Sequence, residues 1–167
     1  PAGGAAIDAI AGEFESVRQI AREGLSAQIC GLSRIIAKDI DASLDADVDM
    51  VHVFVSTSDI QIAHTIKKSY EEIIADSVKA VEHVKDHGRT CLFSAMDATR
   101  TTPAFLREIF GAVEKAHCDI INIPDTVGVA APSAFYRLVK DVCDNTHGMT
   151  VDVHCHNDFG LAVANSL

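Results

Sequence analysis

The sequence predicts an α/β fold whose parallel sheet belongs to a (β/α)8 barrel, and three observations favour this class. Short β-rich runs alternate with stretches of helical period along the chain. The centres of five expected strands lie about 31 residues apart, close to the length of a βαβ unit. Polar side chains follow nearly every strand, as at the active-site end of a barrel, whereas the GxGxxG turn typical of an open doubly wound sheet does not occur.

The first part of the chain contains two expected helices and two expected strands. Apolar residues of helical spacing predict a helix over Glu13–Glu23, which ends at Gly24. A strand is expected over Ala27–Ser33, followed by a polar helical stretch over Asp39–Leu44. The β-branched residues of Met50–Ser56 predict the second strand.

The longest helix is expected over Ser69–His87. Ser69 and Glu72 have the spacing of a capping box, and Gly88 follows the last turn as a stop signal. The third strand is expected over Thr90–Ala95.

Two further βα units are expected in the last part of the chain. The next helix has Thr102 as its expected cap and Pro103 in its first position, and its core-facing residues are Phe105, Leu106, Ile109, Phe110 and Val113. The remaining elements are expected to be a strand over Asp119–Ile123, a helix opened by Pro132, a strand over Thr150–His154 and a helix over Gly160–Leu167.

Composition excludes several classes of protein. An apolar content of 48% is too high for a disordered chain, and the net charge of −10 argues against nucleic-acid binding or a membrane surface. No apolar run reaches the ~18 residues of a membrane span. Five cysteines without a CxxC pair are expected to be reduced thiols in apolar surroundings. These features predict a soluble, cytoplasmic protein.

The last strand carries the strongest candidate for a metal site. Side chains two positions apart share one face of a strand, so Asp152, His154 and His156 point the same way. Two adjacent imidazoles suit one divalent metal ion, and Asn157 and Asp158 add oxygen atoms beside them.

The same alternation selects polar residues on the other strands. If these faces point into a barrel, then His52, Ser94, Asn122 and Thr126 converge near its mouth with the histidine pair. A hydrogen-bonded core histidine remains the alternative for His52. The other histidines are expected on the exposed surface, namely His64, His83, His87, His117 and His147.

The segment HCHNDFGLAVANSL, residues 154–167, closely resembles the metal-binding signature of the 2-isopropylmalate, homocitrate and citramalate synthase family. Four stretches agree with this family in order, namely GEFESVRQIA, VHVFVSTSDIQIAH, FSAMDATRT and INIPDTVGV. The resemblance extends from Gly12 onward and leaves residues 1–11 unplaced. It implies a single partial barrel domain over residues 1–167 that supplies the family's strands 3 to 7. The first two strands, the eighth strand and the C-terminal regions are expected to be absent.

The resemblance implies an acyltransferase of leucine biosynthesis. Such an enzyme condenses acetyl-CoA with a 2-oxo acid, here expected to be 2-oxoisovalerate giving 2-isopropylmalate, and then hydrolyses the thioester. It also implies that the full-length protein is a homodimer with small-molecule substrates and with no nucleic-acid or membrane partner.

The resemblance assigns roles to particular residues. His154 and His156 would bind the divalent metal (Mg, Mn or Zn), and Thr126 would bind the carboxylate of the oxo acid. His52 and Ser94 would line the substrate pocket. The ligand pair would be supported by Asn157 and Asp158, and no residue is assigned as catalytic.

The chain departs from the family pattern at two places, and other functions stay open. The family's Asp-Arg-Glu motif is absent, and Met96 stands where many members have Glu. The alternatives are a lyase similar to 3-hydroxy-3-methylglutaryl-CoA lyase, an aldolase acting on 4-hydroxy-2-oxo acids, or a non-catalytic fragment. Because five βα units do not close a barrel, the chain alone is expected to be inactive and prone to aggregation.

Overall fold

The computed structural model describes residues 11–167, and its centre is a sheet of five parallel strands. The strands follow one another in chain order, β1-β2-β3-β4-β5, and every neighbouring pair is parallel. Their bounds are β1 Cys30–Arg34, β2 Met50–Ser56, β3 Thr90–Met96, β4 Ile120–Asp125 and β5 Thr150–Cys155. This sequential order is that of a barrel wall, whereas a doubly wound sheet reverses its order at a switch point. The predicted α/β barrel class is confirmed.

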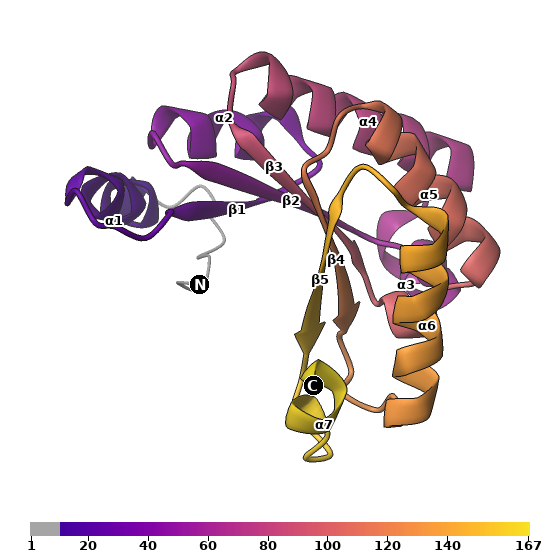
Figure 1. The fold of residues 1–167 in the computed structure, drawn as a ribbon. Helices are drawn as coiled ribbons and strands as arrows, with labels where there is room; N and C mark the ends of the chain where they lie inside the picture. Colours follow the sequence, from indigo (N-terminus) through magenta and orange to yellow (C-terminus); the bar gives the residue numbers. More distant parts are fainter. Residues whose placement is uncertain (1–10) are drawn as a thin grey trace.

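Helices cover the convex face of the sheet, and the opposite, concave face is open (Figure 1). The main helices are α1 Ala11–Arg22, α2 Ala37–Asp45, α4 Tyr70–Asp86, α5 Pro103–Lys115, α6 Pro132–Asn145 and the short α7 Ala162–Ser166. Three short turns complete the list, α3 Asp59–Gln61, the π-helical η1 Ile62–Ile66 and the 3-10 turn η2 Ala98–Arg100. Because the helices cover only the convex face, polar side chains of the strands can gather on the concave face.

The hydrophobic core lies between the sheet and the covering helices. Val51 and Val53 of β2 are fully buried there, and so is Phe93 of β3. Phe93 packs edge-on against Phe110 of α5, with ring centroids 6.3 Å apart and planes at 90°. Because successive side chains of a strand alternate between faces, burying these residues turns their neighbours toward the concave face. The predicted core side of α5 is confirmed.

Several of the predicted elements differ from the structure in extent. The first strand begins at Cys30 rather than Ala27. Its ladder starts where Ile29 receives a hydrogen bond at its carbonyl from Met50 N, and the Asp49 carboxylate binds Ile29 N. The last helix occupies only Ala162–Ser166, because residues before it form a turn. The polar helix is longer than predicted, from Ala37 to Asp45.

Capping was predicted correctly at one helix and wrongly at another. At α4, Ser69 Oγ accepts from Glu72 N, and the Glu72 carboxylate accepts from Ser69 N, which completes the capping box. At α5, Thr102 lies at the cap position but makes no side-chain capping hydrogen bond. Pro103 in the first turn has no backbone N–H to be capped, so the helix begins without that cap.

One of the five cysteines differs from its prediction. Cys143 is exposed, whereas all five were expected in apolar surroundings.

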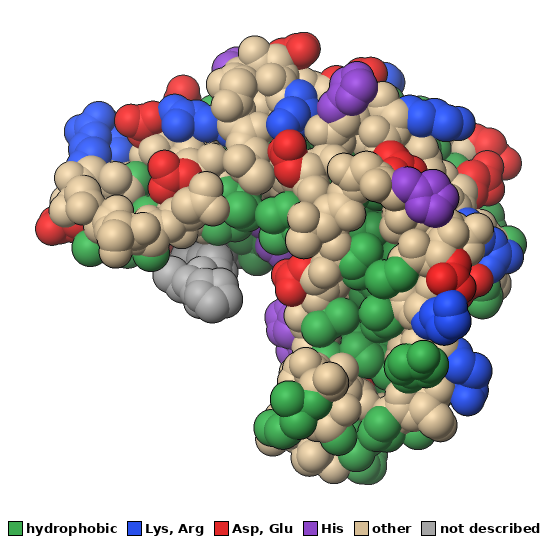
Figure 2. Space-filling view, viewed as in Figure 1, with side chains coloured by type: hydrophobic (Ala, Val, Ile, Leu, Met, Phe, Trp, Pro, Cys, Tyr) green, Lys and Arg blue, Asp and Glu red, His purple; other side chains and the backbone are tan. Residues whose placement is uncertain are grey.

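The sheet ends at β1 on one side and at β5 on the other among residues 11–167. Near the β5 side, hydrophobic side chains reach the surface around α6 and α7 (Figure 2). They include Phe159, Val163 and Leu167, which are 70%, 69% and 102% exposed. Within the same residues, no helix has both the length and the apolar content needed to cross a membrane.

Candidate functional site

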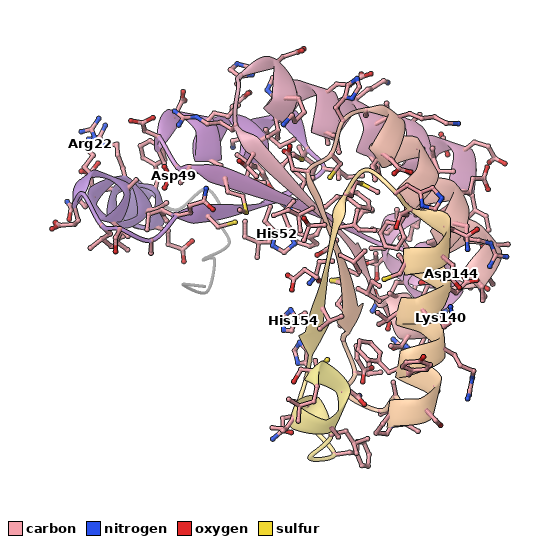
Figure 3. The ribbon with its side chains drawn as sticks, in the orientation of Figure 1. Arg22, Asp49, His52, Lys140, Asp144 and His154 are labelled. Carbon is pink, nitrogen blue, oxygen red and sulfur yellow. The ribbon has the colours of Figure 1, made fainter. Side chains whose placement is uncertain are left out.

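The candidate site lies on the concave face of the sheet, toward the carboxyl ends of the strands. His52 of β2 and His154 of β5 both project into this open side, whereas Lys140 and Asp144 lie on the outer helix α6 (Figure 3). Register explains the grouping, since Ser94 pairs with Asn122 and Asn122 pairs with Asp152. Three neighbouring strands therefore bring polar side chains into one row.

A hydrogen-bonded chain runs from β2 to β5 across this face. His52 Nε2 lies 2.6 Å from Ser94 Oγ, and Ser94 Oγ donates to Asn122 Oδ1 at 3.0 Å. Asn122 Nδ2 then donates to Asp152 Oδ2 at 3.1 Å, while Val153 N donates to Asp152 Oδ1. These four side chains, His52, Ser94, Asn122 and Asp152, are called the polar row below.

The direction of the polar row determines the tautomer of His52. A serine hydroxyl has one proton, and Ser94 donates it to Asn122 Oδ1, which can only accept. His52 Nε2 must therefore carry a proton and donate to Ser94 Oγ. In the neutral ring, Nδ1 is then the atom with a free lone pair. His52 is thus an oriented hydrogen-bond acceptor at Nδ1.

His52 is neutral at physiological pH. Burial lowers its pKa from 6.5 to about 4; the carboxylate of Asp152 acts in the opposite direction, and the imidazole of His154 adds to the decrease. Cys30 also lies beside His52, and burial raises the pKa of its thiol to about 11, so this thiol is uncharged. The ring therefore presents a lone pair rather than a positive charge to the concave face.

The low pKa of His52 predicts acid destabilisation between pH 6.5 and about 4. Above pH 6.5 the ring is neutral in both states; below it, the unfolded ring gains a proton that the folded ring does not. The free energy of unfolding should fall across this window by at most about 3 kcal/mol. Urea denaturation at a series of pH values tests this, with His52→Gln expected to show a flatter profile. An NMR titration that gave His52 a pKa near 6.5 would contradict the prediction.

His154 and His156 form the predicted pair of imidazoles. Their rings are stacked, with centroids 4.8 Å apart and planes at 14°, and both side chains are exposed on the concave side. Asp158 Oδ2 lies 3.9 Å from His156 Nδ1. Asn157 does not contact the pair through its side-chain oxygen; its Oδ1 accepts a hydrogen bond from Ala162 N at the start of α7. The structure thus places Asp158, but not Asn157, beside the pair.

Gly128 allows the loop after β4 to approach this region closely. Its φ is +66°, and a Cβ built there would lie 2.8 Å from Asp158 Oδ2 and 3.0 Å from the carbonyl oxygen of His156. Any larger residue would displace the segment that carries the histidine pair. The loop after β4 and the loop after β5 are therefore one packed unit.

The histidine pair fits two of the ligands of a divalent metal ion. His154 lies in β5 and His156 follows two residues later, directly after the strand, and exposed imidazoles are suitable donors for Mn or Zn. Among residues 11–167, however, no group of three or more His, Cys, Asp or Glu side chains could hold a metal ion. The described residues thus offer two metal ligands, and further oxygen ligands would come from elsewhere in the protein or from the substrate.

Thr126 directly follows β4, and its hydroxyl accepts a hydrogen bond from the neighbouring loop. Asp97 N donates to Thr126 Oγ1 at 2.9 Å. Asp125, directly before it, is fully buried and accepts from Thr99 Oγ1 and Ala130 N, each at 3.0 Å. Thr126 is therefore near the carboxyl edge with His154 but is not part of the polar row.

Reasoning from the sequence did not assign site roles to Asn122, Asp152 or Asp97. Asp152 had a usable signal, since it shares the alternation of His154 and His156. Asn122 was grouped with the converging residues, but its part as the link between Ser94 and Asp152 depends on strand register. Asp97 was not singled out, because its contacts with Ser58 and Thr126 come from loops that are distant in the sequence. Met96, which precedes it, lies on the same strand face as Ser94 and cannot supply a carboxylate there.

Comparison with known protein families shows to which family this chain belongs. The family model described as HMGL-like matches residues 6–167. The chain belongs to the HMGL-like family. The HMGL-like chain is 60% identical over 156 residues to a probable 2-isopropylmalate synthase of Methanosarcina acetivorans, covering 93% of this chain and 30% of that protein.

Two proteins of Methanocaldococcus jannaschii are also similar to the HMGL-like chain. A 2-isopropylmalate synthase is 48% identical, over 93% of this chain and 30% of that protein. An (R)-citramalate synthase is 43% identical, over 93% of this chain and 31% of that protein. The HMGL-like chain thus spans about a third of the length of the curated relatives that it matches.

Solved structures support the fold. The hydroxymethylglutaryl-CoA lyase from Pseudomonas aeruginosa has a TM-score of 0.76 at 21% identity, covering 93% of this chain and 53% of that chain. The HMG-CoA lyase from Bacillus subtilis has a TM-score of 0.78 at 17% identity, covering 92% of this chain and 53% of that chain. The five-stranded sheet of the HMGL-like chain therefore superposes on about half of each of these chains.

Proposed function

We propose that the HMGL-like chain is part of an acyltransferase that condenses acetyl-CoA with a 2-oxo acid and hydrolyses the resulting thioester. The preferred acid is 2-oxoisovalerate, which gives 2-isopropylmalate, and the pathway is leucine biosynthesis. The observation that carries this proposal is the stacked pair His154 and His156 beside the polar row, in a chain 60% identical to a probable 2-isopropylmalate synthase.

The residues of the chain have separate tasks in this proposal. His154 and His156 would hold the divalent metal, with Asp158 beside them, and Asn157 would order the start of α7 behind the pair. A bound metal ion supplies Lewis-acid polarisation of the keto group of the oxo acid. Thr126 donates a hydrogen bond to the carboxylate of that acid.

The polar row shapes the wall of the same pocket. Asn122 and Asp152 hold Ser94, and Ser94 holds the ring of His52 so that Nδ1 accepts a hydrogen bond. A ring oriented and uncharged in this way lines the pocket without competing with the metal for the acid's carboxylate. No proton transfer is assigned to it.

The substrate and the assembly are part of the same proposal. Acetyl-CoA is the co-substrate, and both substrates are metabolites of the cytoplasm, where we place the protein. The full-length protein is proposed to be a homodimer, which analytical ultracentrifugation would test directly. A monomer at all concentrations would contradict this part alone.

A thiol-release assay of the full-length protein tests the reaction. With Mn or Mg present, acetyl-CoA should be consumed fastest with 2-oxoisovalerate, more slowly with pyruvate and with 2-oxoglutarate. Faster release with pyruvate would instead assign a citramalate synthase. Release with none of the three acids would sink the synthase proposal, and cleavage of 3-hydroxy-3-methylglutaryl-CoA or of a 4-hydroxy-2-oxo acid would then be assayed.

The lyase alternative has support only from the fold. The lyase structures similar to this chain are 21% and 17% identical, which is evidence of a shared barrel and not of a shared reaction. The curated relatives at 43–60% identity have synthase names instead. A non-catalytic fragment is tested by the metal titration described in the Discussion.

A further inference from the structure

Three loops at the carboxyl end of the sheet meet around one buried carboxylate, Asp97. Asp97 follows β3 and is fully buried. Arg100 Nε donates to its Oδ1 at 2.8 Å, and Arg100 Nη2 donates to its Oδ2 at 2.6 Å. Ser58, in the loop after β2, donates its hydroxyl to the same Oδ2. Both carboxylate oxygens are thus satisfied, and the side chain cannot rotate without losing these bonds.

The backbone of Asp97 is left-handed, with φ of +70°. This conformation is unfavourable for most non-glycine residues and persists where the surroundings hold it. Here the hydrogen bonds of Ser58 and Arg100 to the side chain hold it, together with Thr101 Oγ1 and Arg100 N donating to the Asp97 carbonyl. The turn aims the Asp97 N–H across to the loop after β4.

The target of this N–H is Thr126 Oγ1, at 2.9 Å. Because the hydroxyl oxygen accepts this bond, its own proton must be donated in another direction. The hydroxyl donates no hydrogen bond to another group within residues 11–167, although the side chain is half-buried. The hydroxyl of Thr126 is therefore prepared as a donor to a group that the described chain does not contain.

We propose that Asp97 is a positioning residue that orients the Thr126 hydroxyl to donate to the carboxylate of the 2-oxo acid. The inference rests on the proposed function, because that function supplies the carboxylate. Asp97 does not touch the acid; it acts through its own N–H. Ser58 and Arg100 belong to the same device, since they hold the turn in place. The loops after β2, β3 and β4 are in this way coupled to the binding of one substrate group.

Affinity for the acid, measured without turnover, tests the proposal. The Kd of 2-oxoisovalerate is determined by calorimetry on the full-length protein with Mn and without acetyl-CoA. Asp97→Asn keeps the size of the side chain and its tolerance of the left-handed backbone, but loses the charge that holds Arg100. It should weaken binding of the acid about tenfold. Acetyl-CoA binding should be unchanged.

A double-variant cycle separates positioning from a general loss of structure. Thr126→Val removes the hydroxyl and should itself weaken the acid at least tenfold. In this background Asp97→Asn should have no further effect, because its only route to the substrate is gone. If Asp97→Asn fails to fold, Ser58→Ala removes one anchor of the carboxylate and should weaken the acid about threefold, again only when Thr126 is present.

Asp119→Asn provides a matched control at the opposite end of the sheet. Asp119 is also an ion-paired carboxylate, held by Lys85 at 2.7 Å and by Cys91 N at 2.7 Å, but it lies directly before β4, at the amino end of the strand. It should leave the Kd of the acid unchanged. An unchanged Kd in Asp97→Asn, an equal effect of Asp97→Asn with and without Thr126, or a wild-type protein that binds no 2-oxo acid would each overturn the proposal. Thiol release by the wild type decides the synthase function separately.

Discussion

Replacing His154 by Ala should weaken divalent-metal binding by at least about 100-fold, because loss of a mere outer-shell partner already costs 10–100-fold. His154 and His156 are the only stacked pair of imidazoles on the concave face within residues 11–167, and their ring centroids are 4.8 Å apart. Each ring would supply one ligand, so His156→Ala should have a similar effect. Thiol release should fall below detection in either variant.

Calorimetric titration of the full-length protein with Mn, Mg and Zn measures this effect. His64→Ala is the matched control, since His64 is an exposed histidine in the η1 turn and belongs neither to the histidine pair nor to the polar row. Its metal affinity should equal that of the wild type. Unchanged affinity in both His154→Ala and His156→Ala would exclude the pair as ligands. Absence of metal binding by the wild type would favour the non-catalytic alternative.

Replacing Phe110 by Ala should lower the free energy of unfolding by about 4 kcal/mol. Phe110 is fully buried on α5 and contacts Phe93 of β3 edge-on, with centroids 6.3 Å apart. The substitution removes this aromatic contact and leaves a cavity between the sheet and α5. Because β3 also carries Ser94, the variant should weaken the polar row as well as the core.

Urea denaturation of the full-length protein, followed by hydrogen exchange of the β3 amides, measures the change. Tyr136→Ala is the control, since Tyr136 is an aromatic residue on α6 that is 67% exposed. That variant should change the stability of β3 by less than about 0.5 kcal/mol. A cost below about 1 kcal/mol for Phe110→Ala would show that the core is not packed as the structure describes.

Local features of the fold were predictable because their causes are local. The β-branched run Met50–Ser56 forms β2 with the predicted bounds, and the Ser69–Glu72 capping box starts α4. The apolar face of α5 is buried as its 3.6-residue period indicates. The predicted start of β1 was wrong, because the N–H of Ile29 binds the Asp49 carboxylate. The predicted side-chain cap at Thr102 was also wrong, since the helix that begins at Pro103 has no such hydrogen bond.

The candidate site was predictable only in part. The pair His154 and His156 follows from strand alternation, and the structure places their side chains on one face. Their role as metal ligands, and the substrate-binding roles of His52, Ser94 and Thr126, stay predictions. The link from Ser94 through Asn122 to Asp152 requires the register of three strands, and no pattern within one strand contains it.

The chain of 167 residues therefore contains two kinds of information. Alternation, capping signals and the spacing of βα units already indicate the element types, the parallel sheet and the face that carries the histidines. Pairing between segments 28–42 residues apart, such as His52 with Ser94, Ser94 with Asn122 and Ser58 with Asp97, arises only when the strands are in register. Tertiary structure therefore decided the tautomer of His52 and the orientation of Thr126, because a hydrogen bond depends on both partners and their distance.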